Sequence, residues 1–184
     1  MFHALIEAAR SDLDGVTRML GAGIHAKDPI AAQSVDVLAA EGLTPPGADT
    51  VLREVAATAT GTMRVRLAEA LYVITADPAW GRHIASVLTD DEFWADQIDA
   101  AIALAHFKPT AELVAALAAG VCNEEYLVRY HSATTLLKHA GQPGTVSDYP
   151  IYFNRIRTPP EGPPTAADRT ARRSVAEELV ALIR

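Results

Sequence analysis

Four segments of this 184-residue chain repeat one pattern of small and apolar residues at an almost constant interval. Equivalent positions are separated by 33, 33 and 32 residues and are occupied by Ser34, Leu67, Ala100 and Ser132. Four leucines follow in the same register, at Leu38, Leu71, Leu104 and Leu136. Residues one helical turn apart share a face, so each copy presents small residues for close approach and a leucine for a core. A single helix pair cannot bury such a face, whereas stacked pairs can. The repeat therefore predicts an α-solenoid.

Residues that start or stop a helix give the expected boundaries. Alanine, the strongest helix former, occurs 35 times, in stretches between such residues. Start signals are an aspartate before proline or a capping box, at Asp28–Pro29, Asp77–Pro78, Thr89 with Glu92, and Thr165 with Asp168. Glycines mark the expected ends at Gly21, Gly23, Gly42, Gly61, Gly120 and Gly141. We expect no strands, and helices near 3–10, 12–20, 29–41, 48–60, 62–76, 78–88, 91–106, 110–119, 124–140 and 165–183.

The repeated segments resemble the D-P-x-V-R-x-x-A-A-x-x-L run of HEAT-like repeats of the PBS lyase type. The resemblance is carried by residues 28–38 and 128–137, and by Met63-Arg64, which stands where Val128-Arg129 does. The third copy departs from the pattern, with Asp96-Gln97 at that place. A period of 33 also suits ankyrin repeats, which rank second because their T-P-L-H-x-A core is absent.

The resemblance implies an all-α fold, a short α-α superhelix of about four to five helix pairs. Residues 1–184 would form a single repeat domain. A proline-rich linker at 158–164 would lead to a C-terminal capping helix at 165–184, which covers the last repeat. The expected repeats span 1–27, 28–61, 62–90, 91–123 and 124–157.

The charge of the chain constrains its partners. Sixteen lysines and arginines stand against 23 aspartates and glutamates, a net charge of −7. Residues 1–140 hold ten basic and eighteen acidic side chains, a net charge of −8. Affinity for nucleic acid rests largely on neutralising phosphates, so we expect no nucleic-acid partner. An acidic body instead favours encounter with a basic protein.

The first residues of the sequence and its cysteine usage do not indicate export. No apolar run approaches the roughly 18 residues that cross a bilayer. Residues 1–7 lack the basic region of a signal peptide. Cys122 is the single cysteine and cannot form an intramolecular disulfide, which favours a reducing compartment. We expect a cytoplasmic protein with no membrane contact.

The motifs that would indicate catalysis are weak. Gly21-Ala-Gly23 follows a predicted helix rather than a strand, so we interpret it as a helix stop and not as a phosphate loop. His131 and His139 are two helical turns apart, too far to share one metal ion. Acidic neighbours disfavour a reactive thiolate at Cys122. We therefore expect no catalytic residue, no metal and no cofactor.

The repeat register predicts two polar rows on the helices that carry the Val-Arg pattern. The first row is Ala31, Arg64, Gln97 and Arg129, and the second is Gln33, Arg66, Asp99 and His131. In HEAT-like stacks such helices resemble the inner, concave layer, with Tyr130 and Tyr152 as aromatic anchors here. The expected binding strip is Arg64, Arg66, Gln97, Asp99, Arg129, Tyr130 and His131. Alternatively, the arginines form structural ladders with Asp36, Glu69 or Asp99.

These expectations favour a non-enzymatic protein-binding helical-repeat module. Such a module could serve as an adaptor, or as an immunity protein that neutralises a basic toxin on its concave face. The alternative, also suggested by the resemblance, is a HEAT-like enzyme of the DNA-glycosylase or lyase type. A glycosylase groove requires strong basicity, and the two rows offer only Arg64, Arg66 and Arg129. Nothing in the sequence indicates an oligomeric state.

Overall fold

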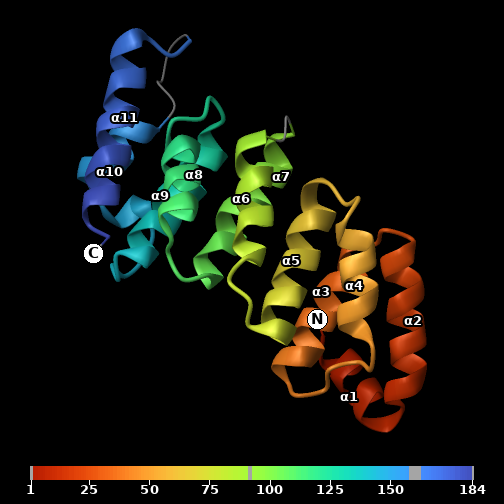
Figure 1. Ribbon diagram of the computed structural model, residues 1–184. Coiled ribbons are helices and arrows are strands. Elements are labelled where there is room, and N and C mark those ends of the chain that lie inside the picture. Colours follow the sequence, from red (N-terminus) through yellow and green to blue (C-terminus); the bar gives the residue numbers. More distant parts are fainter. Residues whose placement is uncertain (1, 91–92, 158–162, 184) are drawn as a thin grey trace. The chain divides into compact units, whose positions relative to one another are not determined.

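The computed structural model describes residues 2–90, 93–157 and 163–183 (Figure 1). Over these residues the chain forms eleven α-helices and two short 3-10 helices, η1 (Leu104–His106) and η2 (Val146–Asp148), and no strands, which confirms the all-α prediction. The α-helices are α1 (His3–Ser11), α2 (Leu13–His25), α3 (Pro29–Ala40), α4 (Ala48–Ala56), α5 (Gly61–Thr75), α6 (Trp80–Asp90), α7 (Trp94–Ala103), α8 (Ala111–Val121), α9 (Tyr126–His139), α10 (Pro150–Ile156) and α11 (Ala166–Ala181).

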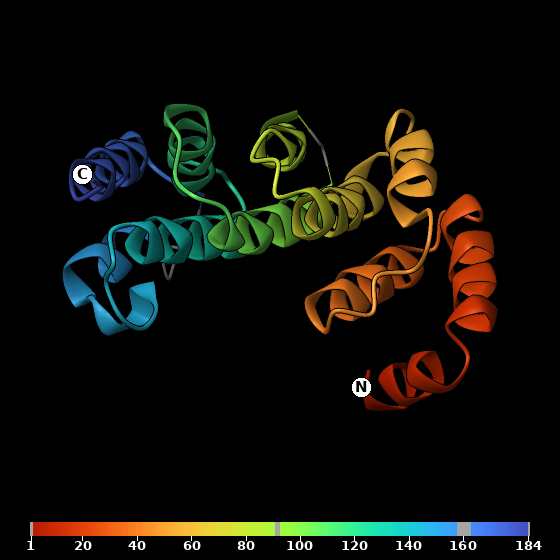
Figure 2. The ribbon, with the colours of Figure 1, turned by 60° about the horizontal axis from the view of Figure 1, so that its bottom comes forward.

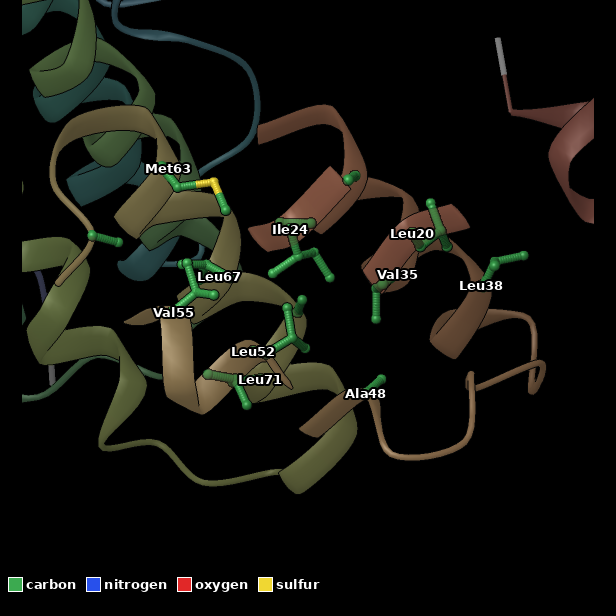
Figure 3. Close-up of a cluster of buried hydrophobic side chains, with 14 of the residues drawn as sticks. Leu20, Ile24, Val35, Leu38, Ala48, Leu52, Val55, Met63, Leu67 and Leu71 are labelled. Atoms are coloured by element: carbon green, nitrogen blue, oxygen red, sulfur yellow. The ribbon is translucent and has the colours of Figure 1, made fainter. Parts of the chain in front are cut away.

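The chain divides into two compact units, with the boundary between Ile84 and Ala85 inside α6. In the first unit, α3 packs along α5. Helix α2 packs against α3, helix α4 packs against α5, and α2 and α4 also pack against each other. Buried apolar side chains from these helices form its core (Figure 3). The largest of them include Leu20, Ile24, Leu38, Leu52, Leu67 and Leu71.

In the second unit, α9 is the central helix. It packs against α7, α8, α10 and α11 (Figure 1). Figure 2 shows α7 and α9 as neighbours, with α8 on one side of the pair. The segment expected to form the capping helix is α11, which packs against α8, α9 and α10. The stacking of all the repeats into one superhelical domain stays a prediction.

The repeated positions are buried alike in all four copies. The four leucines of the repeat are 0% exposed. The equivalent positions that precede them are at most 5% exposed; these are Ser34, Leu67, Ala100 and Ser132. These residues lie on α3, α5, α7 with η1, and α9. The apolar face that the spacing predicts is therefore present on each of these helices.

Several predicted helix boundaries are confirmed. The Asp28 carboxylate accepts the Ile30 N–H at 2.9 Å, with Pro29 as the first residue of α3. Thr165 begins α11 with a complete capping box. Gly42 and Gly141 follow the ends of α3 and α9 with φ of +74° and +70°, the left-handed conformation that glycine adopts at little cost.

Other predicted boundaries are wrong. Gly21 and Gly23 lie inside α2, and Gly120 lies inside α8. A Cβ at Gly120 would be 2.2 Å from the Ser132 hydroxyl oxygen, so this glycine permits the close approach of α8 to α9 rather than ending a helix. Gly61 is the first residue of α5, not the stop of the helix before it.

Two further start signals act differently from what we expected. Thr89 lies in the last turn of α6, where its hydroxyl donates to the Ala85 carbonyl, and its expected capping partner Glu92 lies outside the described residues. The Asp77 carboxylate accepts the Ala79 N–H at 2.9 Å, and α6 begins at Trp80 rather than at Pro78. Helix α10 covers a segment for which we expected no helix. Most of the predicted linker, residues 158–162, lies outside the described residues.

Within the described part of the chain, no helix combines the length and the apolar character needed to span a membrane.

Candidate functional site

The first predicted row faces neighbouring parts of the protein more than solvent. Ala31, Gln97 and Arg129 are buried, and Arg64 is half-buried. The Arg64 Nε donates to the Ala59 carbonyl at 2.8 Å. The Gln97 side chain accepts a hydrogen bond of 3.1 Å from the Asn123 amide, which joins the first turns of α7 to the loop before α9. These contacts leave little of this row available to a partner.

Arg129 belongs to the interior of the second unit. Its side chain is 0% exposed. The Nε donates to the Ile156 carbonyl at 2.6 Å, and Nη1 donates to the carbonyls of Asn123 and Glu124 at 2.9 and 2.7 Å. Burial lowers the pKa of Arg129 to about 10. The guanidinium joins the end of α10 to the residues just before α9, so Arg129 has a structural role.

A second arginine, Arg172 on α11, is buried beside it. Arg172 is 1% exposed, and its Nη1 lies 3.2 Å from a Glu124 carboxylate oxygen and 3.4 Å from the Asn123 carbonyl. Its Nε and Nη2 make no hydrogen bond. Hydrogen bonds from Arg172 and Arg169 lower the pKa of Glu124. Nothing in the sequence distinguishes Arg172 from the other charged residues of the C-terminal helix, so this cluster was not predicted.

The second predicted row is more exposed than the first. Gln33, Arg66, Asp99 and His131 are all half-buried. In the first unit, Arg66 Nη1 lies 2.8 Å from the carboxylate of Glu69, one turn further along α5. This pair matches the structural alternative for Arg66, although both partners lie on one helix.

In the second unit, His131 is accompanied by aromatic residues. Its ring meets the ring of Tyr130 edge-on, with 5.2 Å between centroids. The Tyr130 hydroxyl accepts a hydrogen bond of 3.0 Å from Ser147. Burial, followed by the charge of Lys138, lowers the pKa of His131, which favours the neutral ring. Tyr152, the other expected aromatic anchor, lies on α10 beside Tyr149, with 6.3 Å between ring centroids.

Helix α7 carries a second apolar stripe in addition to its buried one. Trp94, Ile98 and Ile102 are spaced four residues apart, so they share one side of the helix. Trp94 is 44% exposed, Ile102 is 41% exposed, and Ile98 is half-buried. On the neighbouring helix α9, Leu127 is also 44% exposed. Large apolar side chains this exposed are unusual when they gather on adjacent helices.

Two hydrogen bonds hold α7 and α9 side by side in parallel register. The Thr135 hydroxyl donates to the Ala101 carbonyl at 2.7 Å, and the His139 Nε2 lies 3.0 Å from the Leu104 carbonyl. Trp94 and Leu127 therefore stand at the same, N-terminal end of the pair. We call Trp94, Ile98, Ile102, Leu127, Tyr130 and His131 the α7/α9 face.

Acidic residues also lie on α7 and at the start of α9. Asp96 and Asp99 lie on α7 and are half-buried, and Glu125 at the start of α9 is exposed. Lys138 lies near the opposite end of α9. Asp96 in the first turn of α7 and Glu125 at the N-cap of α9 oppose the positive ends of the helix dipoles, which is a sufficient reason for them to be there.

Of this face, Tyr130 and His131 belong to the predicted binding strip, whereas Trp94, Ile98, Ile102 and Leu127 were not predicted. A signal was present, because α7 has apolar residues on two sides: the buried Ala100, Ala101 and Leu104, and the stripe Trp94, Ile98 and Ile102. A surface helix of a globular protein usually has only one apolar side.

The side chains considered for metal binding or nucleophilic chemistry do not gather into a site within the described ranges. No three histidine, cysteine, aspartate or glutamate residues described there could hold a metal ion together. Burial raises the pKa of the Cys122 thiol, and the side chain lies at the end of α8.

Comparison of the chain with protein-family models finds no match. Comparisons with curated proteins and with solved structures find no match either.

Proposed function

We propose that this protein is a non-enzymatic protein-binding helical-repeat module that receives its partner on the α7/α9 face. One observation carries the proposal: Trp94, Ile102 and Leu127 are each more than 40% exposed on two adjacent parallel helices. Contiguous exposed apolar residues mark interaction surfaces, and tryptophan and tyrosine are enriched among residues that dominate binding energy.

The charge of the chain supports a basic protein as the partner. The net charge is −7, and residues 85–184 hold nine lysines and arginines against thirteen aspartates and glutamates. Opposite charge speeds the encounter of two proteins and disfavours wrong partners. Both an adaptor and an immunity protein against a basic toxin fit this description.

The proposal is tested by capture with a matched pair of variants. The tagged chain, Ile102→Asp and Ile151→Asp are each incubated with a lysate of the source organism, and retained proteins are identified by mass spectrometry. Ile151 is 66% exposed on α10, outside the α7/α9 face, so its variant adds the same charge elsewhere on the second unit. We expect a basic protein that is retained by the wild type and by Ile151→Asp and lost by Ile102→Asp.

Retention of the same proteins by all three chains would contradict the proposed site, and retention of none would contradict the proposed function. The captured partner then separates the two roles. If its expression alone stops growth and co-expression of this chain restores growth, the protein acts as an immunity protein. If the partner is harmless, the adaptor role is favoured.

A further inference from the structure

Arg172 on α11 is a buried cation whose hydrogen-bond donors are mostly unpaired. The residue is 1% exposed, and its Nε and Nη2 atoms meet no acceptor in the described part of the chain. Its Nη1 atom lies 3.2 Å from the Glu124 carboxylate and 3.4 Å from the Asn123 carbonyl. Charge-assisted hydrogen bonds are ordinarily about 2.7–2.9 Å long, so both contacts are weak. A buried guanidinium is costly unless its charge and its donors are satisfied.

A second arginine of the same unit shows what satisfies such a group. Arg155 donates from two nitrogens to the two carboxylate oxygens of Glu178, at 2.9 and 3.0 Å, although both side chains are partly exposed. The Nε and Nη2 atoms of an arginine lie on one edge of the planar guanidinium, and they too can donate in parallel to two oxygens of one anion. In Arg172 this edge is the unpaired one.

The charges around Arg172 favour an anion at that edge. Arg129 is buried beside it, and the Nη1 atoms of both arginines contact the Asn123 carbonyl. Burial, followed by the charge of Arg172, lowers the pKa of Arg129 to about 10. No carboxylate of the second unit is buried among the described residues. The carboxylates that act on the two arginines are exposed or half-buried; they are Glu124, Glu125 and Asp168.

We propose that Arg172, with the charge of Arg129 beside it, binds a small oxyanion, a phosphate or a carboxylate, two oxygens of which accept from Nε and Nη2. The anion enters on the side of Glu124, whose side chain is 61% exposed and can move without loss of packing. Bound there, it stabilises the docking of α11 against the residues before α9. The inference goes beyond the proposed function, because it concerns neither the α7/α9 face nor a protein partner.

Urea unfolding followed by circular dichroism tests the site, with sodium phosphate replacing sodium chloride at constant ionic strength. Phosphate also stabilises proteins in general, because it is excluded from their surfaces, so the test compares variants. Arg172→Met removes the unpaired edge. Arg173→Met is the matched control, because it removes the same charge from an exposed neighbour on the same helix.

We expect phosphate to raise the urea midpoints of the wild type and of Arg173→Met equally. The rise in Arg172→Met should be less than about half as large, because a ligand that binds only the folded state stabilises it in proportion to its affinity. In Glu124→Gln the rise should exceed that of the wild type, because the competing carboxylate is gone. Acetate at the same concentration distinguishes the sources: an effect equal to that of phosphate identifies a carboxylate ligand, and a smaller effect identifies phosphate.

Amide hydrogen exchange of the wild type provides a second measurement that needs no variant. Phosphate should increase protection in α11 and in the residues just before α9, and leave the helices of the first unit unchanged. An equal rise of the urea midpoint in the wild type and in Arg172→Met would overturn the site. If Arg172→Met does not fold, a uniform or absent change in exchange would overturn it instead.

Discussion

At the scale of single residues, Arg129 shows how a side chain that looks like a binding residue can be a structural one. Its guanidinium satisfies three carbonyl oxygens from two separate segments: Asn123 and Glu124 before α9, and Ile156 at the end of α10. A buried acceptor that loses its donor retains the full cost of its desolvation. Removal of this one side chain would therefore take the donor from the carbonyl of buried Ile156 and from two partly buried carbonyls before α9.

We predict that Arg129→Met lowers the free energy of unfolding by about 3 kcal/mol. Arg129→Lys should recover little of this loss, because an ammonium group lacks the planar fork that reaches three acceptors. Urea denaturation followed by circular dichroism measures both changes. Arg157→Met is the control, since Arg157 is exposed, and it should alter the stability by less than about 0.5 kcal/mol. An effect of similar size in both methionine variants would contradict the structural role.

His139 has a pH-dependent effect on stability. Burial lowers its pKa, although the carbonyls of Leu104 and Phe107 raise it in part. An unfolded histidine titrates near pH 6.5, so below about pH 6.5 the unfolded chain binds more protons than the folded chain. Stability therefore falls as the pH decreases from about 6.5 towards the lowered pKa of the folded state.

The corresponding prediction is that His139→Gln reduces the loss of stability between about pH 6.5 and pH 5. The slope should not vanish, because the pKa values of His83 and His131 are lowered too and act in the same direction. Urea midpoints at several pH values give the slope for each protein. Identical slopes for wild type and variant would show that His139 is not a source of the pH dependence.

At the scale of elements, the helices divide into those that local signals define and those that packing defines. Helix α11 is of the first kind: Thr165 and Asp168 form the capping box that their spacing predicts. Helix α10 is of the second kind. A helix of seven residues is too short to be stable alone. Two tertiary contacts hold α10 in place: the hydrogen bond from Arg129 to the Ile156 carbonyl, and a bidentate salt bridge between Arg155 and Glu178 with N–O distances of 2.9 and 3.0 Å. Pro150 at its first position is a local start signal, but a proline alone does not predict a helix this short.

We predict that Thr165→Ala destabilises the protein by about 1 kcal/mol through loss of the α11 cap. Thr170→Ala is the matched control, because Thr170 is exposed within the same helix and alanine is the better helix former. It should be neutral or slightly stabilising. Amide hydrogen exchange should show that the loss of protection in Thr165→Ala begins in the first turn of α11. Equal effects of the two substitutions would contradict the cap.

At the scale of the whole molecule, charge is the property that separates the proposed function from the glycosylase-type alternative. Residues 1–84 hold seven basic and ten acidic side chains, and residues 85–184 hold nine and thirteen, so both parts are acidic. In addition, the most buried arginines, Arg129 and Arg172, are directed into the second unit. A surface that binds a phosphate backbone needs basic side chains exposed together.

We therefore predict that the protein passes through a heparin column at an ionic strength of about 0.15 M. A cation-exchange resin of similar charge density controls for simple charge effects. Strong retention on heparin alone, which falls steeply as salt is added, would favour a nucleic-acid groove and would revive the glycosylase-type alternative.

The sequence by itself determined most of the helices, though not α10, and the inward faces of the four repeated ones. Helical spacing is a local property, so Leu38, Leu71, Leu104 and Leu136 could be assigned to a core without knowledge of their neighbours, and all four are buried. Only the tertiary structure decided whether the side chains of the polar rows and of the second apolar stripe on α7 are buried or exposed. Periodicity specifies which residues share a side of a helix, but not whether that side meets carbonyl groups, as at Arg129, or water, as at Trp94. That choice depends on which segments, distant in sequence, come to lie against the helix.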